Sequence, residues 1–293
     1  MITADLAALS AFVPRQESAE TMATRLYVEW YLDPKPARAN AGPPEPVELS
    51  APAALDAAHA AGDRFEPGWT AVLVSTTGRV KATNGHIERL VELGAYVDLD
   101  RPGRCAEPGD RLLVSARRSG IEDGFWITRS ITWDNTAEQP LTRIYLNISL
   151  PNAPIAVARV TATLDGRRYA VKVALATDGQ QRPDSLVIYV DRDAYHGKVG
   201  QLLGPCLAEL AQLGLLEPWA PRLTARLAPG VAAADGTADG ASYGSELCRG
   251  IAAAFRPGCD PAAVAREVLR QLGRDPDRPY LEAGETRDYD RIA

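Results

Sequence analysis

Alternating apolar and polar positions predict a series of β-strands through the middle of the chain. Successive side chains of a strand point to opposite faces, so an apolar residue at every second position marks one buried face. Segments of this kind, or short β-rich runs bounded by turn residues, cover 70–76, 95–99, 111–116, 124–128, 143–150, 158–164, 169–175 and 185–190. We expect Asp165-Gly166 to join two of these strands in a tight hairpin.

Helical periodicity governs the two ends of the chain. Residues 1–32 carry apolar side chains at helical spacing, whereas 33–52 hold six prolines and indicate a loop or linker. Further helices are expected at 53–61, 200–213, 241–255 and 261–272, with Ser242 as the N-cap of the helix at 241–255. We therefore predict an α+β fold, mainly an antiparallel sheet flanked by helices.

The predicted elements divide the 293 residues into three parts. An N-terminal helical segment with the Pro-rich linker occupies 1–65, a small β-rich subdomain 66–130, and an α+β domain 131–293. This length suffices for one large domain or two ordinary ones.

Composition removes several classes of function. The net charge of −6 argues against a general binder of nucleic acid or anionic membranes, so any anion site must be a local cluster. No signal peptide or membrane-length apolar run is evident, and we expect a cytoplasmic protein. The four cysteines lack CxxC spacing, and neither a GxGxxG motif nor a P-loop occurs. We therefore expect no metal, disulfide framework, nucleotide or other cofactor.

Lys172 is the most informative single residue. The chain has four lysines among 32 basic residues, and Lys172 alone lies inside an apolar strand-like run, 169–175. It shares a strand face with Ala170 and Ala174, whose small side chains leave room around it. A desolvated lysine has a lowered pKa and can act as a base. On an exposed sheet face the same pattern would mean a solvated lysine.

A second strand-like run, 141–150, carries several polar groups on one face. Arg143, Tyr145, Asn147 and Ser149 alternate there with an apolar face. This face has no acidic residue, and it combines a cation with hydrogen-bonding groups, which favours an anion-binding surface. Arg143 in a cross-strand ion pair is the alternative.

Further candidates follow downstream. Arg182 comes shortly after the Lys172 strand, Tyr189 ends the next strand, and Arg249 and Arg256 are seven residues apart, so we expect them on one helix face. Both arginines could equally flank a helix in solvent. We interpret His86 as a turn residue, and His196 as a surface residue that is also the best histidine candidate for a catalytic acid.

Five segments, in this order, resemble the HopA-type effector family of plant-pathogen type III secretion. They are Arg143-Ile-Tyr-Leu-Asn147, Tyr169-Ala-Val-Lys-Val173, Arg182-Pro-Asp-Ser-Leu-Val-Ile-Tyr189, Leu227-Ala-Pro-Gly-Val-Ala-Ala-Ala234 and Ser242-Tyr-Gly-Ser-Glu-Leu-Cys-Arg249. Within that family the chain is more similar to the lyase components of class V lanthipeptide and thioamitide pathways in actinobacteria. The resemblance covers roughly residues 66–285.

A more distant resemblance, to bacterial phosphothreonine lyases, implies roles for these residues. Their pattern is Lys-x-His on one strand, Lys-Val on another, an arginine about a dozen residues later, and two arginines seven apart. Arg143-x-Tyr145, Lys172-Val173 and Arg182 match the first three places, with tyrosine replacing the histidine acid, and Arg249 with Arg256 matches the last. The resemblance implies that Lys172 is the base, Tyr145 the acid and the arginines the phosphate ligands, and on chemical grounds Asn147 or Tyr189 could steady the enolate.

These resemblances imply a metal-independent lyase. It would remove phosphate from phosphoserine or phosphothreonine in a ribosomal precursor peptide, giving dehydroalanine or dehydrobutyrine. A separate Ser/Thr kinase, in a stable complex with this protein or acting apart from it, would supply the substrate. Two alternatives stay open: a non-catalytic module that binds peptide or kinase, and a lyase that also assists thioether cyclisation. The sequence does not identify the peptide, the order of dehydrations or the oligomeric state.

Overall fold

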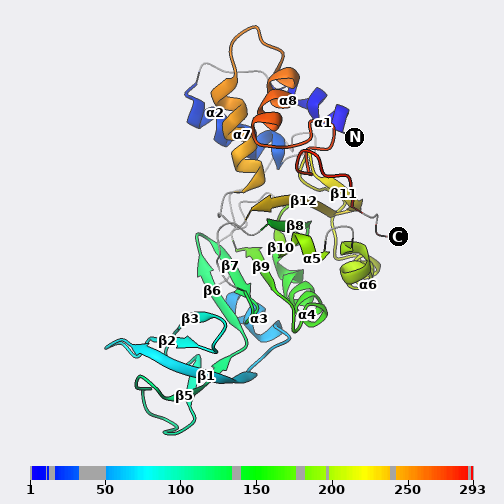
Figure 1. The fold of residues 1–293 in the computed structure, drawn as a ribbon. Helices are drawn as coiled ribbons and strands as arrows, with labels where there is room; N and C mark the ends of the chain where they lie inside the picture. The colour runs from blue at the N-terminus through cyan, green and yellow to red at the C-terminus, as the bar shows by residue number, and fades with distance from the viewer. Residues whose placement is uncertain are drawn as a thin grey trace.

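The computed structural model describes residues 2–10, 12, 17–32, 51–133, 140–175, 182–195, 198–237, 242–289 and 292. Within them the chain forms two antiparallel sheets and a set of mostly short helices, the α+β class expected from the sequence (Figure 1). The helical elements are α1 (Ile2–Ser10), α2 (Ala19–Arg25), the π-helix η1 (Leu26–Tyr31), α3 (Ala51–Ala58), the 3-10 turn η2 (Leu150–Asn152), α4 (Ala153–Thr163), α5 (Arg192–Tyr195), α6 (Val199–Gln212), α7 (Tyr243–Ala254) and α8 (Pro261–Gln271).

A five-stranded sheet with its own core forms the smaller lobe, in the order β3-β2-β1-β5-β4 (Figure 1). Its strands are β1 (Phe65–Val74), β2 (Val80–Thr83), β3 (Glu88–Val91), β4 (Tyr96–Asp98) and β5 (Arg111–Ser115). Trp69, Val80 and Leu112 are buried between them because apolar residues alternate with exposed ones along each strand. The smaller lobe thus buries the hydrophobic side chains of its sheet in a core of its own.

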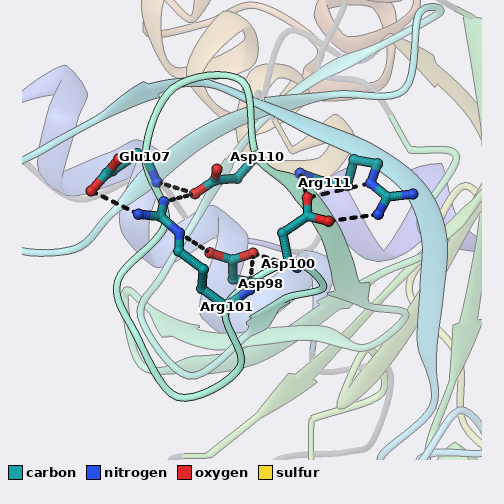
Figure 2. Close-up of polar contacts among 6 residues, drawn as sticks. All are labelled: Asp98, Asp100, Arg101, Glu107, Asp110 and Arg111. Carbon is teal, nitrogen blue, oxygen red and sulfur yellow. Dashed lines mark hydrogen bonds and ion pairs between the residues drawn. The ribbon is translucent and has the colours of Figure 1, made fainter.

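An ion-pair network fixes the loop between β4 and β5. Figure 2 shows Arg101 lying between Asp98, Glu107 and Asp110, and a neighbouring pair between Asp100 and Arg111. The Asp98 side chain is fully buried, and its Oδ1 accepts hydrogen bonds from the amides of residues 100 and 101. The network therefore shapes a turn, and most of its members are too exposed to contribute much stability.

A seven-stranded antiparallel sheet forms the larger lobe, in the order β11-β12-β8-β10-β9-β7-β6. Its strands are β6 (Arg118–Glu122), β7 (Phe125–Arg129), β8 (Pro140–Leu146), β9 (Tyr169–Ala174), β10 (Leu186–Asp191), β11 (Ala225–Ala228) and β12 (Val231–Thr237). Because β6 and β7 pair into this sheet, the strands divide near residue 116, and the boundary expected at residue 130 does not follow them.

Residues 158–164 were expected to be a strand, and this prediction was wrong: 158–163 belong to helix α4, and Leu164 is its C-cap. Pro154 occupies the first turn, where its missing N–H costs nothing. The buried Ala153, Ala156, Val157 and Val160 recur at helical spacing, which outweighs the β-branched residues of the segment. Asp165 and Gly166 accordingly end a helix, and they do not form a hairpin between two strands.

The first helices are fastened to the larger lobe by Asp5. Its Oδ2 accepts a hydrogen bond from the Leu223 amide at 3.0 Å, and its Oδ1 lies 3.2 Å from Nη1 of Arg222. Arg222 also donates from Nε to the carbonyl of Trp30 at 2.8 Å. These bonds tie α1 and η1 to the segment before β11, and η1 packs against α7.

Residues 33–50 of the expected linker lie outside the described residues. No helix in the described part of the chain is long and apolar enough to span a bilayer.

Candidate functional site

One face of the larger sheet gathers most of the candidate residues. Strand register places Tyr145, Val187 and Lys172 in one cross-strand row, and Arg143, Tyr189 and Ala170 in the next. Residues in such rows project from the same face, so Arg143, Tyr145, Lys172 and Tyr189 share it. We call this the candidate face. Lys172 and Tyr145 lie two strands apart, a Cα separation of roughly 10 Å.

Lys172 is half-buried and rests on an aromatic ring. Its Nζ lies 3.7 Å from the ring centroid of Phe125, which projects from β7 toward the same face. No ion pair to Lys172 occurs among the described residues. Burial lowers its pKa, Arg182 lowers it further, and the carboxylate of Asp184 opposes both. A cation–π contact attracts the ammonium without neutralising it.

Arg182 enters the same neighbourhood and is held by Asp184. The guanidinium donates from Nε to Oδ1 at 2.9 Å and from Nη2 to Oδ2 at 3.1 Å, the two-pronged geometry of a strong pair. Arg182 also donates to the hydroxyl of Tyr27 at 3.3 Å and lies 5.7 Å from the centroid of Phe125. Phe125 is therefore close to two cationic side chains, Lys172 and Arg182.

Tyr145 is buried on the candidate face. Burial raises its pKa to about 12, although the charge of Arg143 lowers it. Desolvation of the phenol thus outweighs the charge of Arg143. Tyr145 therefore stays protonated at neutral pH, and its hydroxyl is able to donate a hydrogen bond.

Arg143 is 5 % exposed and is accommodated by a glycine on the neighbouring strand. An ideal Cβ on Gly236 would lie 2.3 Å from its Nη1. Only the absence of a side chain on β12 lets the guanidinium occupy this position. Tyr189, its cross-strand neighbour, packs on Trp133 and Ala170, and burial raises its pKa against the lowering effect of Arg143.

Two candidates are not brought to this site. Asn147 follows the last residue of β8, and its Nδ2 donates to the carbonyl of Trp219 at 3.1 Å, so its amide braces a loop. Arg256 lies beyond the end of α7, where its Nη1 donates to the carbonyls of Ala253 and Phe255. The expectation that Arg249 and Arg256 share one helix face was wrong, because the helix stops at Ala254.

Arg249 lies in α7 with an exposed side chain. Ser242 caps the start of that helix, as the sequence predicted, and α7 begins close to the end of β12 (Figure 1). Seven residues of helix separate Arg249 from Ser242, about 10 Å along the axis. His86 is an exposed turn residue, as interpreted, and His196 lies outside the described residues.

Sequence reasoning missed four residues of this neighbourhood: Tyr27, Tyr31, Phe125 and Asp184. Phe125 lies within the predicted strand 124–128, where alternation could have found it, and Asp184 lies directly before the predicted strand 185–190. Tyr27 and Tyr31 come from η1, more than 100 residues before Lys172, and no local pattern predicts that contact. Their four-residue spacing marked a helix face and gave no sign of what it would meet.

The arrangement suits an anion held beside a base. Arg143 and Arg182 carry positive charges and Asp184 a negative one, so these three side chains keep a net positive charge, while the carboxylates of Glu122 and Asp123 also act on Lys172. Tyr27, Tyr145 and Tyr189 add phenolic hydroxyls on the same side. No group of three or more His, Cys, Asp or Glu side chains in the described ranges could hold a metal ion.

Comparisons with known proteins give the chain a family. Two effector proteins of Pseudomonas syringae with solved structures resemble it over 96 % of this chain and 97 % of each of theirs. The effector from pathovar tomato strain DC3000 has 15 % identity and a TM-score of 0.55, and the one from pathovar syringae strain 61 has 12 % identity and a TM-score of 0.49. No curated protein matches the chain. The model of the HopA1 effector protein family matches residues 116–281, more than half of the sequence and nearly all of the larger lobe, and the chain therefore belongs to the HopA1 effector protein family.

Proposed function

We propose that this protein is a phosphoserine/phosphothreonine lyase that acts on a phosphorylated ribosomal precursor peptide, as in lanthipeptide-type biosynthesis. Elimination would leave dehydroalanine from phosphoserine and dehydrobutyrine from phosphothreonine. The observation that carries the proposal is Lys172, a half-buried amine with a lowered pKa on the same face as Arg143 and Tyr145. β-Elimination needs this combination of a base and an anion site.

The reaction balances without water or cofactor. Neutral Lys172 removes the α-proton of the phosphorylated residue, and the electron pair forms the Cα–Cβ double bond as the Cβ–O bond breaks. Inorganic phosphate departs with the bonding electrons, and the proton remains on the Lys172 ammonium until solvent takes it. Because an α-proton is weakly acidic, a base of lowered pKa makes this step feasible near neutral pH.

The hydrogen-bond donors around Lys172 would bind the phosphate and assist its departure. Arg182 and Arg143 present guanidinium groups that match phosphate oxygens, and Tyr145 donates a hydrogen bond to the leaving oxygen. Asp184 repels a phosphate directly, but its two hydrogen bonds fix the Arg182 guanidinium in one orientation. We assign Asp184 as a positioning residue for that reason.

The remaining candidate residues are assigned roles away from the base and the phosphate, or none in the site. Tyr189 adjoins Arg143 and Ala170 and would border the bound residue. Arg249 is exposed in α7 and would meet the peptide away from its phosphate. We leave Asn147 and Arg256 out of the proposed site because their side chains serve a loop and a helix end.

The proposal requires a separate kinase, because the sequence has no nucleotide-binding motif. We expect a Ser/Thr kinase to phosphorylate the peptide first, and its product to pass to this protein. A non-catalytic peptide- or kinase-binding module remains the main alternative, and the buried amine beside arginines favours the enzyme over it. Thioether cyclisation would need a site for a cysteine thiol as well.

Mass spectrometry of a phosphorylated precursor peptide tests the proposal. Incubation with the protein should convert the phosphopeptide to a product lighter by the elements of phosphoric acid, and thiol addition should then label the new double bond. Hydrolysis to serine or threonine would identify a phosphatase. Unchanged phosphopeptide that binds the protein would favour the non-catalytic module.

A further inference from the structure

Tyr31 of η1 carries a buried hydroxyl without a regular hydrogen bond. The side chain is 1 % exposed, and no described residue offers its oxygen a partner of good geometry. Leaving a buried hydroxyl unpaired is costly, so such groups are rare in native proteins and call for an explanation. Tyr243, its neighbour, shows the usual arrangement, because its hydroxyl donates to the carbonyls of Leu223 and Pro279.

Packing fixes the ring of Tyr31 in this position. It stacks on Tyr27 with ring centroids 5.6 Å apart and meets Tyr243 edge-on at 6.2 Å. The ring also lies against the first turn of α7, where an ideal Cβ on Gly244 would come within 2.2 Å of Tyr31 Cε1. A glycine at that point is therefore required, and the ring has no room to turn its hydroxyl toward a different partner.

The Tyr31 hydroxyl lies near the phenol of Tyr145, a residue of the candidate face. It is close enough to Tyr145 to act on that phenol as a donor, although the contact lacks regular hydrogen-bond geometry. Its stacking partner Tyr27 already contacts Arg182 and Asp184 through its own hydroxyl. Two tyrosines from the N-terminal segment thus border the region where the proposed phosphate would lie.

We propose that Tyr31 is a second phenolic donor to the substrate, and that its hydroxyl, together with that of Tyr145, binds an oxygen of the departing phosphate group. This inference rests on the proposed function and extends it, because it makes the N-terminal helical segment part of the active site. Binding of the phosphate supplies the partner that the hydroxyl lacks in the free protein. The cost of the unpaired hydroxyl is then recovered when substrate binds.

Tyr31→Phe tests this directly, since it removes one oxygen and keeps the ring. Because the lost hydroxyl has no regular partner, the variant should melt at the same temperature as the wild type or higher. Its rate of phosphate elimination from a phosphoserine peptide should fall at least tenfold. The matched control is Tyr169→Phe, a buried tyrosine on the opposite face of the sheet whose hydroxyl contacts His59 at 3.4 Å. That variant should melt lower and keep its elimination rate.

Binding of inorganic phosphate separates this inference from the proposed reaction. Phosphate should raise the melting temperature of the wild type, and the rise should shrink in Tyr31→Phe and persist in Tyr169→Phe. If the wild type eliminates no phosphate but this binding pattern holds, the lyase proposal fails and the assignment of Tyr31 stands. If Tyr31→Phe binds phosphate and eliminates as the wild type does, or melts lower with unchanged kinetics, the assignment is overturned. Absence of phosphate binding and elimination in the wild type overturns both.

Discussion

At the scale of single residues, burial moves the two central pKa values in opposite directions. Burial lowers the pKa of Lys172, because the charged form of lysine is the protonated one. It raises the pKa of Tyr145 to about 12, because the charged form of tyrosine is the deprotonated one. Both shifts favour neutral side chains. On the candidate face the neutral amine of Lys172 is thus more accessible than that of an exposed lysine, and Tyr145 stays a protonated donor, the combination that proton abstraction beside a departing anion requires.

The pH dependence of elimination follows from these directions. Only neutral Lys172 can accept the α-proton, so the rate should rise with pH through a single ionisation below the ordinary lysine value of 10.5. Tyr145 stays protonated up to about 12, so no descending limb should appear in the alkaline range below that value. Initial rates after brief pH jumps measure this profile. A rate that falls above neutral pH would contradict the assignment of Tyr145 as a protonated donor.

Tyr145→Phe should slow elimination by about ten- to a thousandfold, because it removes the donor to the leaving oxygen. The fold should persist, since the ring and its packing remain. Steady-state kinetics on a phosphoserine peptide measure the loss, and Tyr169→Phe serves as the matched variant on the other face. Full activity of Tyr145→Phe would exclude Tyr145 as the acid.

At the scale of elements, the sheet positions the site through its register and through one glycine. Gly236 of β12 leaves space for the Arg143 guanidinium on β8. Gly236→Ala would place a methyl group on that space, and the flexible end of Arg143 would yield before the backbone does. We expect an intact fold with a displaced guanidinium and a rate lowered by about a hundredfold.

The control for this change is Gly204→Ala in α6, where an added Cβ meets no atom within 4 Å. It should leave elimination unchanged and improve the helix slightly. Circular dichroism establishes the fold of both variants, and peptide kinetics compare their rates. Equal activity of Gly236→Ala and wild type would show that the position of Arg143 does not matter for the reaction.

Elements with strong local signals could be predicted from the sequence, and those set by distant contacts could not. The alternation of apolar and polar residues predicted which side chains of β8 and β9 share a face, and Ser242 as N-cap predicted the start of α7. The segment 158–164 was misassigned because β-branched residues favour strands in isolation, whereas burial at helical spacing decides the outcome in the fold. Site residues on these strands could be predicted from the sequence pattern. Tyr27 and Tyr31 could not, because only tertiary packing brings η1 to the site.

At the scale of the whole molecule, apolar packing and a few polar contacts together hold the N-terminal segment to the body. Asp5→Ala would remove the acceptor of the Leu223 amide and the carboxylate that pairs with Arg222, in a largely buried setting. We expect the free energy of unfolding to fall by about 3 kcal/mol, the lower end for breaking a buried pair, because Arg222 is partly exposed. Urea unfolding measures this change.

Asp165→Ala provides the comparison, since Asp165 pairs with Arg64 on the surface. Its cost should be about 1 kcal/mol or less. A similar cost for both variants would show that the Asp5 contacts do not anchor the N-terminal helices.

The proposed pathway places this chain after a kinase. A phosphopeptide that passes from the kinase to this protein within a complex would be protected from loss. We therefore expect the protein and its kinase to elute together in size-exclusion chromatography when the peptide is present. Separate elution at every concentration tested, with and without peptide, would leave transfer by free diffusion.

The central claim is that Lys172 is the base of a phosphate elimination. The most direct measurement is mass spectrometry of a phosphorylated precursor peptide after incubation with wild type, Lys172→Ala, Lys172→Arg and the control Lys81→Ala, whose lysine pairs with Glu88 on the surface of the smaller lobe. Wild type and Lys81→Ala should yield the dehydrated peptide, and both Lys172 variants should leave the phosphopeptide intact, since a guanidinium does not release its proton. Elimination by Lys172→Ala at the wild-type rate would contradict the claim.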